Sequence, residues 1–233
     1  MESNILILGS KSPAKLPKIQ VDEVFSSNAS AELARIYIDK VKKIKHTCVI
    51  GARSFSKIEE IKIRVVNSEP NQIIVRDYEE VYSYIGSLFN NSSKIIKFTK
   101  REQFFYQKNF FKKNIIDLFL AEFNYEKKII NKVKHIINGF VSNGFMGVSS
   151  GFFSLLYAAE QYPKSNLILS GLSFEGGGHY YQSGQMTTQR GLVDAYLFRF
   201  LNKKIKDRIF IFDKEISKKL NVKNLDEEEL IFN

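Results

Sequence analysis

Short apolar runs separated by amphipathic stretches mark most of this chain. The run Asn4 to Gly9 is apolar after its first residue and ends at a glycine, as is typical of a buried parallel strand. Similar runs predict strands at 24–25, 46–50, 72–75, 166–170 and 208–212, and a further one at 61–66. Longer stretches predict helices at 31–43, 151–161 and 191–202. The alternation predicts an α/β fold: a three-layer sandwich with a mostly parallel, Rossmann-like sheet.

Length and composition fit a single domain over residues 1–233. Of the 233 residues, 44% are hydrophobic and 20 are phenylalanine, which is enough for a packed core. A lone cysteine, Cys48, and three histidines leave no means to build an internal disulfide or a Cys/His metal cluster. Because the sequence shows no secretion signal and no long apolar run, the expected location is the cytoplasm.

The formal net charge of +10 indicates anionic partners, such as nucleic acid, anionic lipid, or an acidic or phosphorylated substrate. Basic residues gather in the middle of the chain, where residues 94–134 carry eleven Lys or Arg and four acids, interleaved with aromatics. We expect residues 94–138 to form a basic helical insertion of two helices. Its surface suits an anionic membrane, a charged glycan acceptor or nucleic acid. The alternative is a lysine-coated hairpin whose aromatics face the core.

Small residues follow the first predicted strand and precede the long apolar helix. The loop Gly9-Ser10-Lys11-Ser12-Pro13 lies where open parallel sheets bind ligands, beyond the carboxyl end of a strand. It matches neither Gly-x-Gly-x-x-Gly nor the Walker pattern, so it is either another kind of nucleotide loop or a tight turn. Ser149-Ser150-Gly151 can aim backbone amides at a phosphate, or can only cap the helix.

Three glycines, at 176–178, join the predicted strand 166–170 to a His-Tyr-Tyr triplet. His179 is a proton carrier near neutral pH, and Tyr180 and Tyr181 are phenol donors. A glycine loop beside such groups lets a ligand approach the main chain, which indicates a site for a phosphorylated ligand. The remaining polar candidates are expected outside the site: His46 and His135 at the surface, and Asp194, Tyr196 and Arg199 on a solvated or interhelix face.

In order and spacing, these segments resemble the sialyltransferases, especially the small bacterial CMP-sialic acid-dependent family. Ile5 to Pro13 is similar to the family's opening strand and nucleotide loop, and Phe25-Ser26-Ser27-Asn28 to its Phe-x-x-Asn, whose asparagine contacts the donor. The stretch from Ser149 to Phe174, which includes Gly171, resembles the family's Thr-Ser-Gly, helix and Ser-Gly-x-Asp-Phe series. His179-Tyr180-Tyr181-Gln182 is similar to the His-Tyr-Tyr-Asp/Glu motif of the animal enzymes.

The resemblance implies a set of donor-binding residues with acid–base chemistry beside them. His179 is the implied acid or base, and Tyr181 has the spacing of a donor-phosphate ligand. The chain departs from the family pattern at Ser173, which replaces an aspartate, and at Glu175, which replaces a phosphate-binding tyrosine. Thr187 to Arg190 occupies the neighbourhood where the family has its catalytic histidine. The implied nucleotide contacts are Gly9, Ser10, Asn28, Ser149, Ser150, Gly151, Gly171, Tyr180 and Tyr181.

The implied function is inverting, metal-independent transfer of sialic acid, Kdo or a related acidic keto sugar from its CMP donor. The acceptor would be a bacterial surface glycan or glycolipid, of lipopolysaccharide or capsule, reached by peripheral contact with the inner face of the cytoplasmic membrane. No cofactor is expected, because the CMP-sugar is itself the donor. Glu175 acting as a nucleophile would give retention instead. The alternative is a non-catalytic protein that binds RNA or an anionic membrane; nucleic acid is not an expected partner of the transferase.

Overall fold

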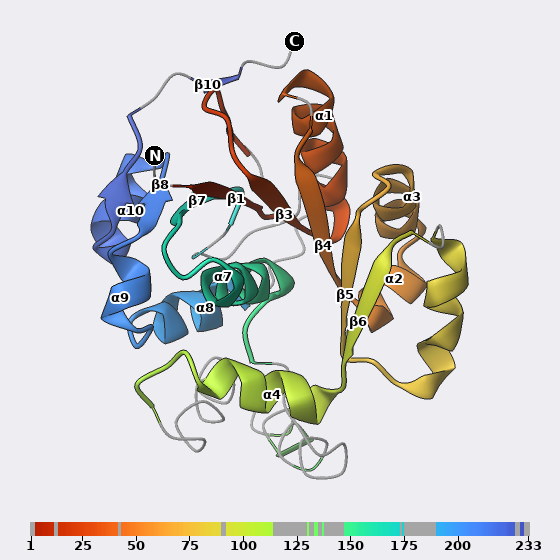
Figure 1. Cartoon of the computed structure of the whole chain (residues 1–233). Coiled ribbons are helices and arrows are strands. Elements are labelled where there is room, and N and C mark those ends of the chain that lie inside the picture. The colour runs from red at the N-terminus through yellow and green to blue at the C-terminus, as the bar shows by residue number, and fades with distance from the viewer. Residues whose placement is uncertain are drawn as a thin grey trace.

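A computed structural model describes residues 3–11, 14–41, 43–89, 92–113, 130, 133–134, 137, 147–172, 174, 190–226 and 229–230. Its centre is an eight-stranded sheet in the order β6-β5-β4-β3-β1-β7-β8-β9, and every neighbouring pair is parallel (Figure 1). The strands are β1 (Asn4–Leu8), β3 (Glu23–Ser27), β4 (Lys45–Gly51), β5 (Gln72–Arg76), β6 (Lys94–Phe98), β7 (Asn166–Ser170), β8 (Ile209–Ile211) and β9 (Lys223–Asn224).

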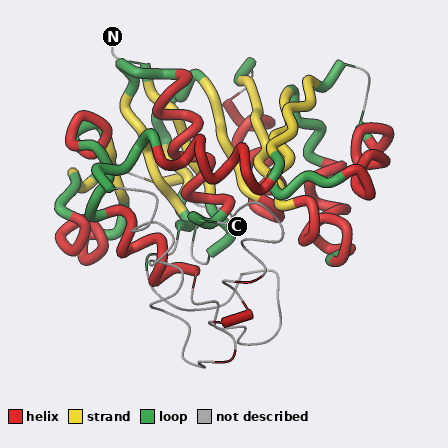
Figure 2. The backbone as a smooth tube through the Cα atoms, turned by 90° about the horizontal axis from the view of Figure 1, so that it is seen from below, coloured by secondary structure: helices red, strands yellow, loops and turns green. Residues whose placement is uncertain are grey.

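Helices cover both faces of this sheet, which confirms the predicted three-layer α/β sandwich (Figure 2). Side chains alternate along a strand, so Ile5 and Ile7 pack on one face and Leu6 and Leu8 on the other. The first face carries α4 (Lys100–Lys108), α7 (Ser150–Gln161) and α8 (Arg190–Phe198). The second carries α1 (Ala31–Val41), α2 (Ala52–Lys57), α3 (Glu59–Asn67) and the 3-10 helix η2 (Glu80–Leu88). The short helices α9 (Lys203–Lys206) and α10 (Lys214–Leu220) follow α8.

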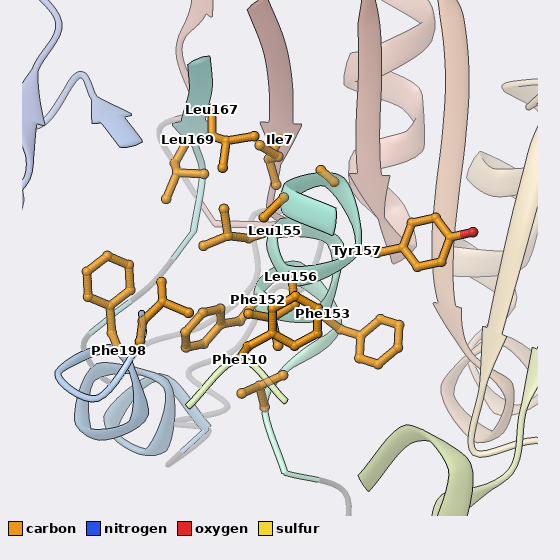
Figure 3. Close-up of a cluster of buried hydrophobic side chains, with 14 of the residues drawn as sticks. Ile7, Phe110, Phe152, Phe153, Leu155, Leu156, Tyr157, Leu167, Leu169 and Phe198 are labelled. Atoms are coloured by element: carbon orange, nitrogen blue, oxygen red, sulfur yellow. The ribbon is translucent and has the colours of Figure 1, made fainter. Parts of the chain in front are cut away.

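The central element of the first layer is α7, which packs across β1, β3 and β4. All its residues from Gly151 to Ala159 are buried, which explains why its sequence is apolar on every side. The ring of Phe152 lies 5.8 Å from that of Phe198 on α8, centroid to centroid, and Figure 3 shows both residues in the apolar cluster around α7. The ring of Phe174 lies 6.1 Å from that of Phe152. This packing fixes the position of the N-terminus of α7 at the carboxyl edge of the sheet.

Two element predictions in the first half of the chain are wrong. Residues 61–66, predicted as a strand, belong to α3, where Ile61 and Val65 are buried and Ile63 is 49% exposed. Apolar residues spaced by four indicate a helix face, whereas alternation would have placed Ile63 with Ile61 and Val65. Lys94–Phe98, predicted as helix, is the strand β6 at the edge of the sheet. Both of its lysines are exposed to solvent, as is common in edge strands. Of the predicted two-helix insertion, the described part of the chain shows the strand β6, then α4, and helical residues at 130, 133–134 and 137.

Two short strands follow β8 in the described part of the chain. β9 pairs with β8 at the edge of the main sheet. β10 (Glu229–Leu230) pairs antiparallel with β2 (Leu16–Pro17) in a separate two-stranded sheet. Among the described residues, no helix has the length and apolar character needed to cross a membrane.

Strand order places the candidate site. From β1 the chain builds outward through β3, β4, β5 and β6, and then returns to the other side of β1 as β7 (Figure 1). The direction in which successive strands are added therefore reverses between β1 and β7. Open α/β sheets bind ligands beyond the carboxyl ends of their strands near such a reversal of strand order.

Candidate functional site

The carboxyl edge of the sheet brings together four predicted segments: the loops after β1, β3 and β7 and the start of α7. The first contact is between Gly9, after β1, and Gly171, after β7. Gly9 N donates to Ser170 O at 2.8 Å, and Lys11 N donates to Gly171 O at 2.9 Å. A Cβ on Gly9 would lie 2.2 Å from Gly171 O, and Gly171 itself has φ +65°. Both glycines are thus required for the backbones to meet, which is the role the structure gives to these two predicted nucleotide contacts.

Hydroxyl groups then join the ends of β1 and β3. The Ser10 side chain is buried, and its Oγ donates to Ser27 O at 2.8 Å. Ser27 Oγ and Ser30 Oγ donate to Leu8 O at 3.2 and 2.8 Å. The Ser10 hydroxyl, predicted to contact the nucleotide, is therefore used to hold the two loops together.

Asn28 follows β3 directly and links it to the end of β4. Its φ of +51° is in the left-handed region, which asparagine tolerates better than most residues. Its Oδ1 accepts a hydrogen bond from Gly51 N at 3.2 Å. Because the carbonyl oxygen is held in this way, the carboxamide NH₂ remains the donor that Asn28 can offer to a ligand.

The N-terminus of α7 contributes Ser149, Ser150 and Gly151. Ser149 is the N-cap: its Oγ accepts from Phe152 N at 3.2 Å, and its own backbone N donates to Asp194 Oδ1 at 2.9 Å. The capping alternative therefore holds for Ser149. Helix geometry leaves the amides of Ser150 and Gly151 without an intrahelical acceptor, so they can bind an anion.

Ser150 and Gly151 adjoin the ends of the neighbouring strands. A Cβ built on Gly51 would lie 3.8 Å from Ser150 Oγ, and one built on Gly151 would lie 3.4 Å from Ser27 Oγ. The end of α7 thus meets the loops after β3 and β4. Together with Asn28, these residues form a cluster of amide and hydroxyl groups, which we call the strand-end cluster: Ser27, Asn28, Gly51, Ser150 and Gly151.

Arg76, at the carboxyl end of β5, lies behind the strand-end cluster and is only 1% exposed. Its Nε donates to Gln103 Oε1 at 3.0 Å, its Nη2 to Val148 O at 2.8 Å and its Nη1 to Ser150 Oγ at 3.4 Å. The guanidinium carbon also lies 4.6 Å from the centre of the Phe153 ring. These contacts offset part of the cost of burying a charge, and they connect that charge to the Ser150 hydroxyl.

Two of the polar residues expected outside the site are buried. Asp194 on α8 is 3% exposed and holds the Ser149 amide at the start of α7, which is the interhelix alternative and makes it a structural part of the site. The expectation that His46 lies at the surface is wrong. His46 is 2% exposed, with Nε2 2.8 Å from Ser26 Oγ, and burial lowers its pKa to about 4. A histidine that is enclosed and neutral in this way has no access to a ligand at the carboxyl edge.

Several predicted residues lie outside the described residues: Glu175, His179, Tyr180, Tyr181 and His135. The assignments of His179 as acid or base and of Glu175 as alternative nucleophile stay predictions. Within the described part of the chain, no three His, Cys, Asp or Glu residues gather in a way that could hold a metal ion.

A cavity of about 120 Å³ adjoins the Gly171 turn, at the carboxyl ends of β7 and β8. Its walls are largely apolar and include two lysines from the loop after β1. Among the residues that line the cavity are Lys11, Lys15, Leu172, Phe174, Ile211 and Asp213. Space for a second ligand therefore exists beside the loops described above.

The sequence interpretation missed Arg76, Gly51 and the role of Asp194. A signal existed for two of them. Arg76 directly follows the apolar triplet Ile-Ile-Val in β5, and Asp194 stands next to Val193 on the buried side of α8. A charge placed on a buried face indicates a specific partner. Comparison with known protein families, with curated proteins and with solved structures finds no match to this chain.

Proposed function

We propose that this protein is a glycosyltransferase that moves an acidic keto sugar, sialic acid, Kdo or a relative, from a CMP donor to a surface-glycan acceptor. The observation that carries the proposal is the strand-end cluster with Arg76 behind it. Free first-turn amides, a hydroxyl, a carboxamide and a buried cation together suit a phosphate ester. The position at the carboxyl edge, near the reversal of strand order, supports the same interpretation.

The proposed chemistry needs stabilisation of a leaving phosphate. An acceptor hydroxyl attacks the anomeric carbon, the bond from that carbon to the phosphate oxygen breaks, and the electron pair leaves with CMP. Ser150 Oγ, the Gly151 amide and the Asn28 NH₂ would donate to the phosphate oxygens as their charge grows. His179 would take the proton of the acceptor hydroxyl. Because the acceptor displaces CMP directly in a single step, the configuration at the anomeric carbon is inverted. In the alternative mechanism, Glu175 attacks first and the product retains its configuration.

We further propose that this transfer needs no metal ion and takes place in the cytoplasm, at the inner face of the membrane. The cavity next to Gly171 would receive part of the acceptor, because it adjoins the strand-end loops and offers lysines to an anionic glycan. Basic residues on β6 and α4, including Lys94, Lys97 and Lys108, would attract an anionic surface.

The test is isothermal titration calorimetry of the whole chain with CMP, AMP and single-stranded RNA, followed by an assay for CMP release from CMP-sialic acid and CMP-Kdo. The proposal expects CMP to bind more tightly than AMP and one donor to release CMP in excess chelator. Equal affinity for CMP and AMP, or release only when magnesium or manganese is added, would contradict it.

RNA or membrane binding is the second candidate function, and one observation favours it. Phe105 on α4 is 46% exposed, and the guanidinium carbon of Arg101 lies 5.9 Å from the centre of its ring. An exposed ring beside a cation can stack on a base or enter a membrane interface. In the calorimetric test, tight RNA binding without CMP binding would support this candidate and refute the transferase.

A further inference from the structure

We infer that the Asp77 carboxylate binds the ribose hydroxyls of the nucleotide and makes the site specific for a nucleotide with an intact ribose. The inference rests on the proposed function, because it concerns the same site. It adds a specificity-determining residue that neither the sequence motifs nor the proposed phosphate contacts include. The ligand class that it names is a ribonucleotide, in preference to the dideoxy form that lacks both hydroxyls.

Asp77 directly follows β5, one strand away from the strand-end cluster. Gly51 of the cluster pairs with Arg76 across β4 and β5, so Asp77 comes just beyond that pair, at the carboxyl edge of the sheet (Figure 1). Neighbouring strands lie roughly 5 Å apart. The 5′-phosphate and the ribose hydroxyls of one nucleotide are separated by a distance of this order, so the cluster and Asp77 can bind them at the same time.

The order of the strands places Asp77 and the acceptor cavity on opposite sides of the strand-end cluster. In a nucleotide-sugar donor, the phosphate joins the nucleoside on one side to the transferred sugar on the other. The cavity proposed for the acceptor lies at β7 and β8, Asp77 lies at the end of β5, and β3 and β4 come between them. A phosphate bound at the cluster therefore has its nucleoside on the β5 side, where Asp77 lies.

The Asp77 carboxylate is enclosed but keeps acceptor sites for a ligand. The residue is 7% exposed, and within the described part of the chain its Oδ1 accepts no well-formed hydrogen bond. Lys100 Nζ lies 3.5 Å from this oxygen and also 3.5 Å from Glu79 Oε1, so one ammonium group serves two carboxylates. Burial raises the pKa of the Asp77 carboxyl, and Lys100 acts against that shift. Hydroxyl groups of a ligand would supply the donors that this buried carboxylate needs.

The backbone fixes the carboxylate at this position. Asp77 has φ +55°, in the left-handed region that aspartate tolerates better than most residues. The next residue is tied to the end of β6, because Tyr78 N donates to Phe98 O at 2.9 Å. Residues held in sparsely populated backbone conformations are frequent at ligand sites, where the surrounding structure fixes the direction of a side chain.

The experiment measures the dissociation constants of CMP and 2′,3′-dideoxy-CMP for the wild type, Asp77→Gly and Asp77→Asn. Because hydrogen bonds to a charged acceptor are strong, the wild type should prefer CMP by about 10- to 100-fold. Glycine adopts the left-handed conformation freely, so Asp77→Gly removes the carboxylate without straining the backbone. Its affinities for the two nucleotides should be equal within about twofold. Asp77→Asn keeps one acceptor oxygen and should show an intermediate preference.

Asp22→Ala is a matched control at the opposite, amino edge of the sheet. Asp22 Oδ2 accepts a hydrogen bond from Asn4 N at 2.9 Å, so this carboxylate holds the start of β1. Asp22→Ala should lower stability and leave the preference for CMP unchanged. A wild type that binds both nucleotides equally well, or a preference that is unchanged in Asp77→Gly, would overturn the inference. If Asp77→Gly does not fold, Asp77→Asn decides, and an unchanged preference in that variant would overturn it.

AMP and its 2′,3′-dideoxy form separate this inference from the proposed function, because AMP carries the same ribose and phosphate as CMP. If AMP binds as tightly as CMP, and the preference for the ribose form is lost in Asp77→Gly with both bases, the function is rejected and the inference is kept. If CMP binds more tightly than AMP but Asp77→Gly keeps the preference, the inference is rejected and the function is kept. Absence of binding by all four nucleotides would reject both.

Discussion

Replacing Gly9 by alanine should strongly destabilise the protein, because the new side chain would meet backbone atoms of the loop after β7. The new Cβ would lie 2.2 Å from Gly171 O, 2.7 Å from Gly171 C and 2.9 Å from Leu172 Cα. All three are backbone atoms, so no side-chain rotation relieves the contact. The two loops must separate, which disrupts the hydrogen bonds from Gly9 N to Ser170 O and from Lys11 N to Gly171 O.

The magnitude follows from these two effects. Each hydrogen bond contributes a net of about 0.5–1.5 kcal/mol, and overpacking costs typically about 1–3 kcal/mol. We therefore expect Gly9→Ala to lower the free energy of unfolding by about 2–6 kcal/mol, a large share of the roughly 5–15 kcal/mol of a typical domain. Urea unfolding followed by circular dichroism measures the difference.

Gly86→Ala is the matched control, because a Cβ there meets only Ile95 Cδ1 at 3.5 Å, an ordinary contact. Its free energy of unfolding should stay within about 1 kcal/mol of the wild type. If Gly9→Ala were as stable as Gly86→Ala, the close approach of the two loops, and with it the position of the strand-end cluster, would be refuted.

Three further predictions concern single residues. Gly51→Ala should fold normally, since its Cβ meets Ser54 Oγ at 3.7 Å and Ser150 Oγ at 3.8 Å, yet weaken CMP binding by roughly 5- to 100-fold through crowding, as calorimetry can check. The folded-state pKa of His46 is about 4, below its ordinary 6.5. The stability due to neutral His46 is therefore complete above pH 6.5 and should fall by up to about 3 kcal/mol as pH drops to 4, whereas His46→Gln should show a flatter pH profile in urea unfolding. His179→Ala should lower the transfer rate by roughly 10²–10⁴-fold with CMP affinity unchanged, whereas a sugar adduct trapped on Glu175 would show that the mechanism is retaining.

Strands and helices with strong local signals could be predicted from the sequence. β1, β7 and α7 are almost entirely apolar, and their lengths and glycine boundaries distinguish strands from a helix. Residues 61–66 were harder, because a short run with four β-branched residues fits a strand until the burial of Ile61 and Val65 is known. Lys94–Phe98 carries a lysine at either end of its apolar pair, and only the position of β6 at the sheet edge makes that pattern suit a strand.

The candidate site could be predicted only in part. Ser150, Gly151 and Asn28 lie at strand or helix ends that the chain order alone indicates, and the parallel sheet brings those ends to one edge. Arg76 and Asp194 depend on tertiary packing, because nothing local shows that their charges are buried beside α7. His46 was misjudged for the same reason: Lys45 at the start of β4 is exposed, but His46 to Gly51 are all buried, because β4 lies inside the sheet and both of its faces are covered.

The most direct test of the central claim is the affinity of CMP for a variant that lacks two donors of the strand-end cluster. Asn28→Ala combined with Ser150→Ala removes both side chains proposed to hold the phosphate. The matched control is Ser87→Ala, since that hydroxyl donates to Tyr84 O within η2. We expect the double variant to bind CMP at least about 10-fold more weakly than the wild type, whereas Ser87→Ala should bind it equally well. Unchanged CMP affinity in a folded double variant would contradict the central claim.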